Sequence, residues 1–232
     1  MSTFQYIYRN PAYRILTFEG SEVPKLIGYG EDALTYWATT KKLDLLLKEL
    51  EDDSQRYDRL VFYRPSFGRG RIVKKASDRK AEFGEFDAIL STTRAVYLIE
   101  SKWDNLSENK KVVIKLSDVQ ILRHKIFAWY YYHWRVGSDW TEFAERYGDD
   151  FEGRFMKWQR KIAPPSSLLS ENLRYILNQL RNPNKELKNL LLYFYRQGSG
   201  RPHITVKSGD LHFQPLVFAY PTAEKSNYIT IT

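Results

Sequence analysis

Two acidic side chains and one lysine on neighbouring strand-like segments form the set of residues best suited to chemistry. The first segment carries Asp87, and the second ends with the tripeptide Glu100-Ser101-Lys102. Because side chains alternate along a strand, Glu100 and Lys102 are expected on one face. The turn between the segments predicts a hairpin, which would bring Asp87 beside Glu100.

Carboxylates that lie close together in apolar surroundings repel each other, which raises one pKa unless a divalent cation neutralises the pair. All-oxygen ligands favour Mg²⁺ or Mn²⁺ over zinc. Lys102 would orient a water-derived nucleophile and stabilise the charge that grows on a phosphate under attack. This chemistry suits hydrolysis of a phosphodiester. The alternative is an ion-pair cluster at the strand edge without catalytic duty, although buried charges cost desolvation energy.

The acid-x-Lys tripeptide has little meaning alone, because the chain contains four of them. The other three are Asp78-Arg-Lys80, Glu108-Asn-Lys110 and Glu186-Leu-Lys188. Only Glu100 follows directly on an apolar strand-like run, residues 95–99. This position distinguishes it from the rest.

The elements that must position these residues alternate between strands and helices. A Ser117-x-x-Gln120 capping box precedes a long helix from Asp118 to about Arg135, which Gly137 would close. Strands are predicted at 60–63, 83–92, 94–103, 111–116, 190–195, 202–206 and 216–220, and further helices at Glu31 to about Glu51, 139–148, 151–161 and 167–181. The order predicts one mixed α/β domain over residues 1–232, with a core at about 25–135, C-terminal strands at about 188–222 and a helical insertion at about 138–183.

The positive charge of the chain is concentrated in one segment. The sequence has 36 Lys+Arg against 28 Asp+Glu, a formal net charge of +8. Segment 64–80 holds Arg64, Arg69, Arg71, Lys74, Lys75, Arg79 and Lys80 against Asp78 alone. Such a segment is expected to bind a phosphate backbone and to release counterions as it does so. The alternative is a solvated loop that keeps the protein soluble.

Several other classes of protein and site are disfavoured. The chain has no Cys, which excludes disulfides, thiolate zinc sites and a Cys nucleophile. The four His residues (His124, His133, His203, His212) lack metal-ligand spacing and are interpreted as ordinary surface or core histidines. The longest apolar stretch, 126–134, is too short for a membrane helix, and no signal-peptide core is visible, so a cytoplasmic location is expected. The aromatic run 127–134 favours packing over base stacking.

At its acidic residues and Lys102 the sequence resembles the PD-(D/E)XK nuclease superfamily, which has the restriction-endonuclease-like fold. The family pattern is an acid-bearing first helix, a strand, a hairpin with Asp and then (Asp/Glu)-x-Lys, and a following helix. The matching residues are Glu31, Asp87, Glu100 and Lys102. The resemblance covers roughly residues 25–135. Phe86 departs from the Pro of the family name, at a position that bears no catalytic group.

The resemblance implies a central mixed β-sheet flanked by helices and Mg²⁺- or Mn²⁺-dependent cleavage of DNA to 5′-phosphate and 3′-hydroxyl ends. It implies Asp87, Glu100, Glu31 and the Ser101 carbonyl as metal ligands, and Lys102 as the residue that serves the nucleophile. A cut in both strands needs two sites, so a homodimer is expected, with the aromatic helix as its interface.

Two further residues have a functional and a structural interpretation. The motif Gly28-Tyr-Gly30-Glu31-Asp-Ala-Leu34 is similar to the entry of the first helix in archaeal Holliday-junction resolvases, although any acid in a first helical turn gains from the helix dipole. Gln120 stands where many relatives place a Gln near phosphate or the attacking water, and the capping box explains it equally well.

The sequence thus predicts a metal-dependent DNA endonuclease whose preferred DNA structure is open. One rival is a nucleic-acid-binding protein that keeps the fold without catalysis. The other is a structural protein whose Asp87, Glu100 and Lys102 form an ordinary ion network.

Overall fold

A computed structural model describes residues 26–55, 58–68, 81–104, 111–180, 185–221 and 228–231. The helices are α1 (Gly30–Thr40), α2 (Leu43–Glu49), α3 (Asp118–His133), α4 (Trp140–Arg154) and α5 (Leu168–Gln179), with a 3₁₀ turn at Met156–Trp158. The strands are β1 (Leu26–Tyr29), β2 (Leu60–Tyr63), β3 (Ser66–Phe67), β4 (Gly84–Glu85), β5 (Ala88–Ser91), β6 (Ala95–Asp104), β7 (Lys111–Lys115), β8 (Glu186–Arg196), β9 (His203–Lys207), β10 (Phe213–Tyr220) and β11 (Tyr228–Ile231).

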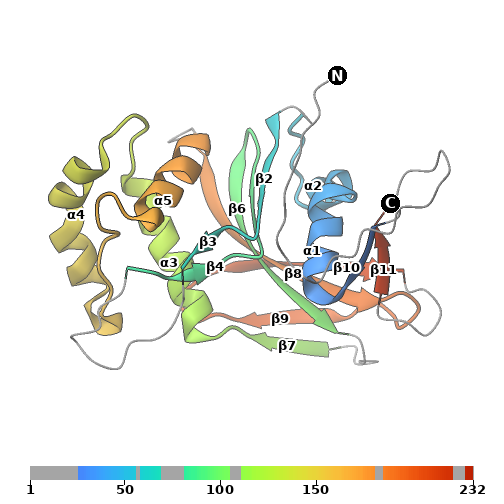
Figure 1. Cartoon of the computed structure of the whole chain (residues 1–232). Coiled ribbons are helices and arrows are strands. Elements are labelled where there is room, and N and C mark those ends of the chain that lie inside the picture. The colour runs from blue at the N-terminus through green and yellow to red at the C-terminus, as the bar shows by residue number, and fades with distance from the viewer. Residues whose placement is uncertain are drawn as a thin grey trace, which may run out of the picture.

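A central five-stranded mixed sheet has the order β10-β8-β6-β5-β2 (Figure 1). Strands β2, β5 and β6 pair antiparallel, whereas β6, β8 and β10 pair parallel. The return from β6 to β8 passes through α3, α4 and α5, as a parallel crossover requires. The prediction of a mixed α/β chain with a central mixed sheet flanked by helices is therefore confirmed.

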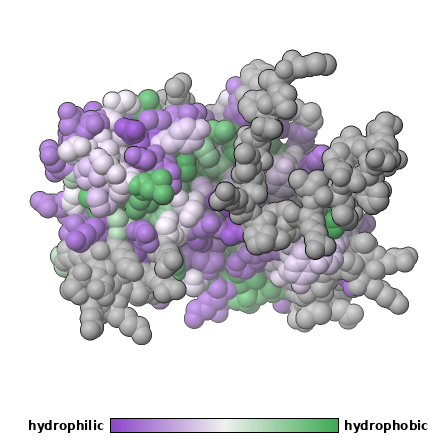
Figure 2. All heavy atoms as spheres, viewed as in Figure 1, coloured by the Kyte–Doolittle hydropathy of each residue, from purple (hydrophilic) through white to green (hydrophobic). Residues whose placement is uncertain are grey.

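Alternation along β6 divides the core between the two faces of the sheet. Val96 and Leu98 pack in a cluster with α3, α4 and α5. Tyr97 and Ile99 pack in a second cluster with α1 and α2. Figure 1 accordingly shows α1 and α2 on one side of the sheet and α3, α4 and α5 on the other. The α4 helix buries Trp140, Phe143 and Phe151 and turns mostly hydrophilic side chains outward, at the left of the molecule in Figure 2.

Three two-stranded sheets complete the fold. The pairs are β1 with β11, β3 with β4, and β7 with β9. The β1–β11 ribbon matters for the site, because β1 runs directly into α1.

Most predicted elements are present, but three predicted helices are wrong. The segment from Glu31 to about Glu51 forms two helices, α1 and α2. In one unbroken helix Leu46 would lie about 120° around the axis from Leu34, at 100° per residue. The break lets both residues bury against the same face of the sheet.

The predicted helices 139–148 and 151–161 are also wrong, because α4 runs without interruption from Trp140 to Arg154. Gly148 is not among the glycines with positive φ and does not end the helix. Burial of Phe151 on the same face as Trp140 and Phe143 outweighs the roughly 1 kcal/mol that a mid-helix glycine costs.

The aromatic run of α3 packs inside the chain, as predicted. Phe127, Trp129, Tyr130 and Trp134 are buried, while Tyr132 is exposed. Because these side chains fill the core, they are not available to a partner; the homodimer, with this helix at its interface, stays a prediction. Within the described ranges, no helix is both long enough and apolar enough to cross a bilayer.

A buried carboxylate fixes the turn between β5 and β6. Asp52 is 5% exposed and accepts hydrogen bonds from the Ser54 amide at 3.0 Å, the Thr92 hydroxyl at 2.8 Å and the Tyr97 hydroxyl at 2.9 Å. Burial alone would raise the pKa of Asp52, but these hydrogen bonds lower it. The anchor holds the closed end of the hairpin whose open end carries Asp87 and Glu100.

We expect Asp52→Ala to lower the free energy of unfolding by about 2–4 kcal/mol, because it leaves buried donors without their acceptor. Chemical denaturation with circular dichroism measures the change. Asp53→Ala is the matched control, since Asp53 is 77% exposed and pairs only with the exposed Arg94 among the described ion pairs. That change should stay within about 0.5 kcal/mol of wild type. Equal effects of the two substitutions would contradict the anchoring role.

Candidate active site

The register of the β5–β6 hairpin sets Asp87 opposite Glu100. Ala88 pairs with Ile99 in the antiparallel ladder, so the next positions outward are Asp87 and Glu100. The Asp87 carboxylate accepts a hydrogen bond from the Ser101 amide at 2.6 Å. The two acids therefore meet across one strand pair, as the sequence predicted.

Asp87 itself does not lie within a strand, which corrects the prediction of one strand over 83–92. The segment divides into β4 and β5, and Asp87 occupies the bend before β5. Two backbone contacts account for the break: the Phe86 amide donates to the Pro65 carbonyl at 3.2 Å, and the Arg64 amide donates to the Asp87 carbonyl at 3.1 Å. These contacts leave the Asp87 side chain free to turn toward β6.

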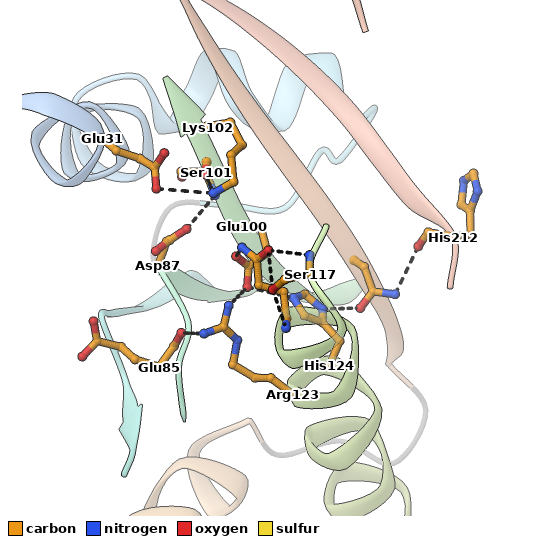
Figure 3. A network of polar contacts seen from close by, with 12 residues as sticks. Glu31, Glu85, Asp87, Glu100, Ser101, Lys102, Ser117, Arg123, His124 and His212 are labelled. Atoms are coloured by element: carbon orange, nitrogen blue, oxygen red, sulfur yellow. Dashed lines mark hydrogen bonds and ion pairs between the residues drawn. The ribbon is translucent and has the colours of Figure 1, made fainter. Parts of the chain in front are cut away.

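Helix α1 brings Glu31 to the same place. Oε1 of Glu31 lies 3.6 Å from Nζ of Lys102, which also donates to the Ser101 carbonyl at 2.5 Å. The Thr35 hydroxyl, one turn along α1, donates to the Ser101 hydroxyl at 2.6 Å. Figure 3 shows Glu31, Asp87 and Lys102 converging around Ser101.

Glu100 faces α3 and has partners of its own there. Its side chain is 1% exposed. Gln120 donates to Oε2 at 2.9 Å, Arg123 forms an ion pair with Oε1, and Nε2 of His124 lies 3.2 Å from Oε1. The carboxylate is thus held from the α3 side, while Lys102 extends toward α1 (Figure 3).

Gln120 forms the predicted capping box and also contacts Glu100, while its role near phosphate or the attacking water stays a prediction. Its Oε1 accepts from the Ser117 amide at 3.0 Å, which completes the capping box of α3. This contact fixes the amide so that Nε2 points to Glu100.

Sequence reasoning missed Arg123 and His124. Both lie on the face of α3 that carries Gln120, three and four residues further on, and that spacing was the available signal. Nδ1 of His124 contacts the Asn189 side chain on β8 at 2.7 Å. The interpretation of His124 as an ordinary core histidine is therefore incomplete, because it also orients Glu100.

The pKa values of the three acids, Asp87, Glu31 and Glu100, shift in different directions. Burial, aided by the nearby charge of Glu100, raises the pKa of Asp87 to about 7. Burial also raises the pKa of Glu31, although Lys102 opposes it. For Glu100, burial is outweighed by His124, Arg123 and Lys102, which lower its pKa. Asp87 and Glu31 therefore form an under-neutralised pair next to a fully paired Glu100.

The donor set around Ser101 fits a hard cation in its chemistry. Asp87, Glu31 and the Ser101 carbonyl supply oxygen atoms only, as Mg²⁺ prefers. The part of the chain that the structure describes contains no group of three or more acidic or histidine side chains placed to hold a metal ion. Mg²⁺ does not require one, since it usually keeps several waters and takes one or two protein carboxylates together with substrate oxygens.

Of the predicted DNA-binding residues, only Arg64 lies within the described residues. Its guanidinium pairs with Asp32 on α1 and with Glu85 on β4. Arg64 therefore links α1 to β4, and these two acids already neutralise its positive charge. Arg69, Arg71, Lys74, Lys75, Arg79 and Lys80 lie outside the described residues.

Comparison of the chain with known proteins found no matching family model, no matching curated protein and no matching solved structure. The site must therefore be interpreted from its own residues.

We expect Asp87→Asn to stabilise the metal-free protein at pH 8. The folded-state pKa of about 7 lies above the ordinary value of 3.8, so between these pH values the folded state keeps a proton that the unfolded state has lost. Stability then falls as pH rises through this window, by on the order of 4 kcal/mol, and levels off above about pH 7. The neutral Asn removes this loss while its oxygen still accepts from Ser101.

Thermal unfolding of both proteins in EDTA from pH 5 to pH 8 measures the effect. The gain in Tm from Asp87→Asn should be several degrees larger at pH 8 than at pH 5. Asp53→Asn controls for the loss of an exposed acid. A gain that does not change with pH would show that Asp87 ionises normally in the folded protein.

Proposed function

We propose that this chain is a metal-dependent deoxyribonuclease that hydrolyses phosphodiester bonds. The observation that carries the proposal is the convergence of Asp87, Glu31 and Lys102 on the Ser101 backbone at the open end of the β5–β6 hairpin. Two acids and an amine that share one point, with one acid shifted toward neutral pKa by burial, are typical of a reactive site. An ion network that served stability alone would gain more from full neutralisation.

The order of elements supports a restriction-endonuclease-like core as part of the same proposal. The sequence runs from α1 through the antiparallel strands β2, β5 and β6 to α3 and the parallel strand β8. The family resemblance implies this arrangement around its acid and acid-x-Lys residues. The helices α4 and α5 between α3 and β8 would then be an insertion.

Asp87, Glu31 and the Ser101 carbonyl would hold a divalent cation, Mg²⁺ or Mn²⁺. Glu100 is a further ligand in the proposal, since Gln120 takes one of the two lone pairs of its Oε2. When bound, the ion would lower the pKa of a water and polarise a phosphate oxygen. Gln120, Arg123 and His124 fix the orientation of the Glu100 carboxylate.

Lys102 would supply a positive charge to the reaction directly from the protein, without the metal ion. The Lys102 side chain is 30% exposed. Its ammonium can therefore contact a ligand while it also contacts Glu31 and the Ser101 carbonyl. A positive charge here would hold the attacking water and stabilise the extra charge on the phosphate. The charge of the basic segment 64–80 suits it to bind the DNA backbone in this proposal.

One observation favours a second candidate function, DNA binding without cleavage. Arg123 already neutralises Glu100 and His124 contacts the same carboxylate oxygen, an arrangement expected of a site that has no metal to hold. The cleavage experiment separates the two functions.

We expect the protein to cut DNA with Mg²⁺ or Mn²⁺ and to leave it intact in EDTA. Supercoiled, linear, single-stranded and four-way-junction DNA are incubated with the protein, and products are resolved on gels. Lys102→Ala should lower the cleavage rate roughly 100- to 1000-fold, the usual loss when one charge-stabilising group is removed. Asp87→Asn should lower it at least as much, while both variants still bind DNA.

Lys188→Ala is the matched control for Lys102→Ala. Lys188 belongs to another acid-x-Lys tripeptide, on β8, where it pairs with Glu186 at 3.2 Å with both side chains more than a third exposed. This variant should cut as wild type does. Binding without cleavage in every metal would overturn the nuclease proposal in favour of the second candidate. A protein that neither binds nor cleaves DNA would contradict both candidate functions.

We also expect Mg²⁺ to stabilise the wild-type protein at pH 8. A tenfold excess over the dissociation constant contributes about 1.4 kcal/mol, which corresponds to a rise in Tm of roughly 3–6 °C for a chain of this size. Asp87→Asn should abolish most of this rise, because the variant lacks one charged ligand. Differential scanning fluorimetry with and without Mg²⁺ measures it, with K⁺ at equal ionic strength as control. An equal rise in the variant would place the ion elsewhere.

A further inference from the structure

Two exposed tyrosines and a partly buried tryptophan form a cluster on the segments that carry the candidate site, here called the aromatic platform: Tyr29, Tyr228 and Trp103. Tyr29 and Tyr228 are each 55% exposed. Their ring centroids lie 5.3 Å apart, and those of Tyr29 and Trp103 lie 5.5 Å apart in an edge-to-face arrangement. Large aromatic rings that stay this exposed while they touch one another call for an explanation beyond packing.

The platform and the site come from the same two segments of chain. Tyr29 stands two residues before Glu31, at the N-cap of α1. Trp103 directly follows Lys102 on β6. Since Glu31 and Lys102 are themselves 3.6 Å apart, the backbone segments that carry Tyr29 and Trp103 meet at the proposed phosphate-binding point.

The platform is held rigidly by its surroundings. Tyr29 is paired with Tyr228 in the antiparallel ladder of β1 and β11, so both rings project from the face of the ribbon opposite the buried Gly28 and Ile229. Figure 1 shows this ribbon beside the start of α1. The indole of Trp103 donates to the Tyr220 hydroxyl at 2.8 Å.

Gly30 permits the backbone conformation at the junction of β1 and α1. Its φ of +74° lies in the left-handed region that favours glycine, and a Cβ at this position would make only an ordinary contact, 3.5 Å, with the Trp103 ring. The chain therefore accepts a left-handed residue at the first position of a helix, which brings Tyr29 against Trp103.

We propose that the aromatic platform stacks an unpaired base of the DNA next to the scissile phosphate. The inference rests on the proposed function and names its substrate class: DNA with unpaired bases, such as a single strand, a flap or an opened junction, in preference to continuous duplex. In a duplex the base faces are covered by their neighbours, whereas an unpaired base offers a π-face to an aromatic ring. The two exposed rings suit an unpaired base, and the Lys102 ammonium suits the phosphate of the same strand.

Charge favours nucleic acid over a protein partner as the occupant. The chain carries a net charge of +8, and the platform borders a lysine that is only partly neutralised by Glu31. A polyanion with flat apolar bases complements both features.

The experiment measures binding in EDTA, where the nuclease reaction is silent. Fluorescence anisotropy gives Kd values for a labelled oligothymidine and for a blunt duplex of equal length. We expect Tyr29→Leu combined with Tyr228→Leu to weaken oligothymidine binding roughly 5- to 100-fold, the usual loss per stacked base, with less than about a twofold change for the duplex. Leu keeps apolar bulk in the ribbon and removes the π-face.

Two controls test the specificity of the effect. Tyr29→Phe with Tyr228→Phe keeps both rings and should bind oligothymidine within about twofold of wild type. Tyr175→Leu removes an equally exposed tyrosine on α5, across the sheet from α1, and should leave binding unchanged. Unfolding midpoints of all variants confirm that the fold is retained.

Unchanged oligothymidine binding in the Leu variant would overturn the platform. So would a wild-type dimer that becomes a monomer in that variant without any change in DNA binding, because the occupant would then be protein. Loss of oligothymidine binding in a protein that never cleaves DNA would support the platform and refute only the nuclease.

Discussion

The burial of an acidic side chain between the central sheet and a helix is the constraint on which the rest of the structure depends. Glu100 lies 1% exposed in the middle of the molecule, where an isolated carboxylate would not remain ionised. The amide and cations of α3 compensate it, and this requirement fixes which face of α3 meets the sheet. On the other side of the sheet, α1 supplies partners to the next two residues of β6: Thr35 contacts Ser101, and Glu31 contacts Lys102.

Two acids at opposite ends of the β5–β6 hairpin illustrate how a site differs from a scaffold. Asp52 follows α2 and is buried against the turn, whereas Asp87 is half-buried at the open end. Asp52 has a full set of donors and a lowered pKa, whereas Asp87 has one backbone donor and a raised one. Evolution commonly accepts such local instability where a ligand restores the balance. The contrast distinguishes Asp87, whose charge is poorly compensated, from Asp52, which anchors the turn.

Sequence patterns predicted most of the fold and about half of the site. The capping box located the start of α3, and apolar runs located β6 and β8, because those signals are local. The break between α1 and α2 and the continuity of α4 could not be read from the chain, since tertiary burial of Leu46 and Phe151 decides them. The tripeptide and hairpin predicted the pairing of Asp87 with Glu100, whereas the compensation by Arg123 and His124 depends on how α3 docks.

The crossover between β6 and β8 has a consequence for how the chain is made. Ala95 pairs with Glu186, so the central ladder of the sheet joins residues separated by about two fifths of the polypeptide. Such high contact order slows folding, because a long loop must close before the pairing stabilises it. During synthesis the β2–β5–β6 hairpin unit leaves the ribosome long before its parallel neighbour and presents an unpaired apolar edge meanwhile. Protection of that edge by chaperones would govern the yield of the native protein more than the stability of the finished fold does.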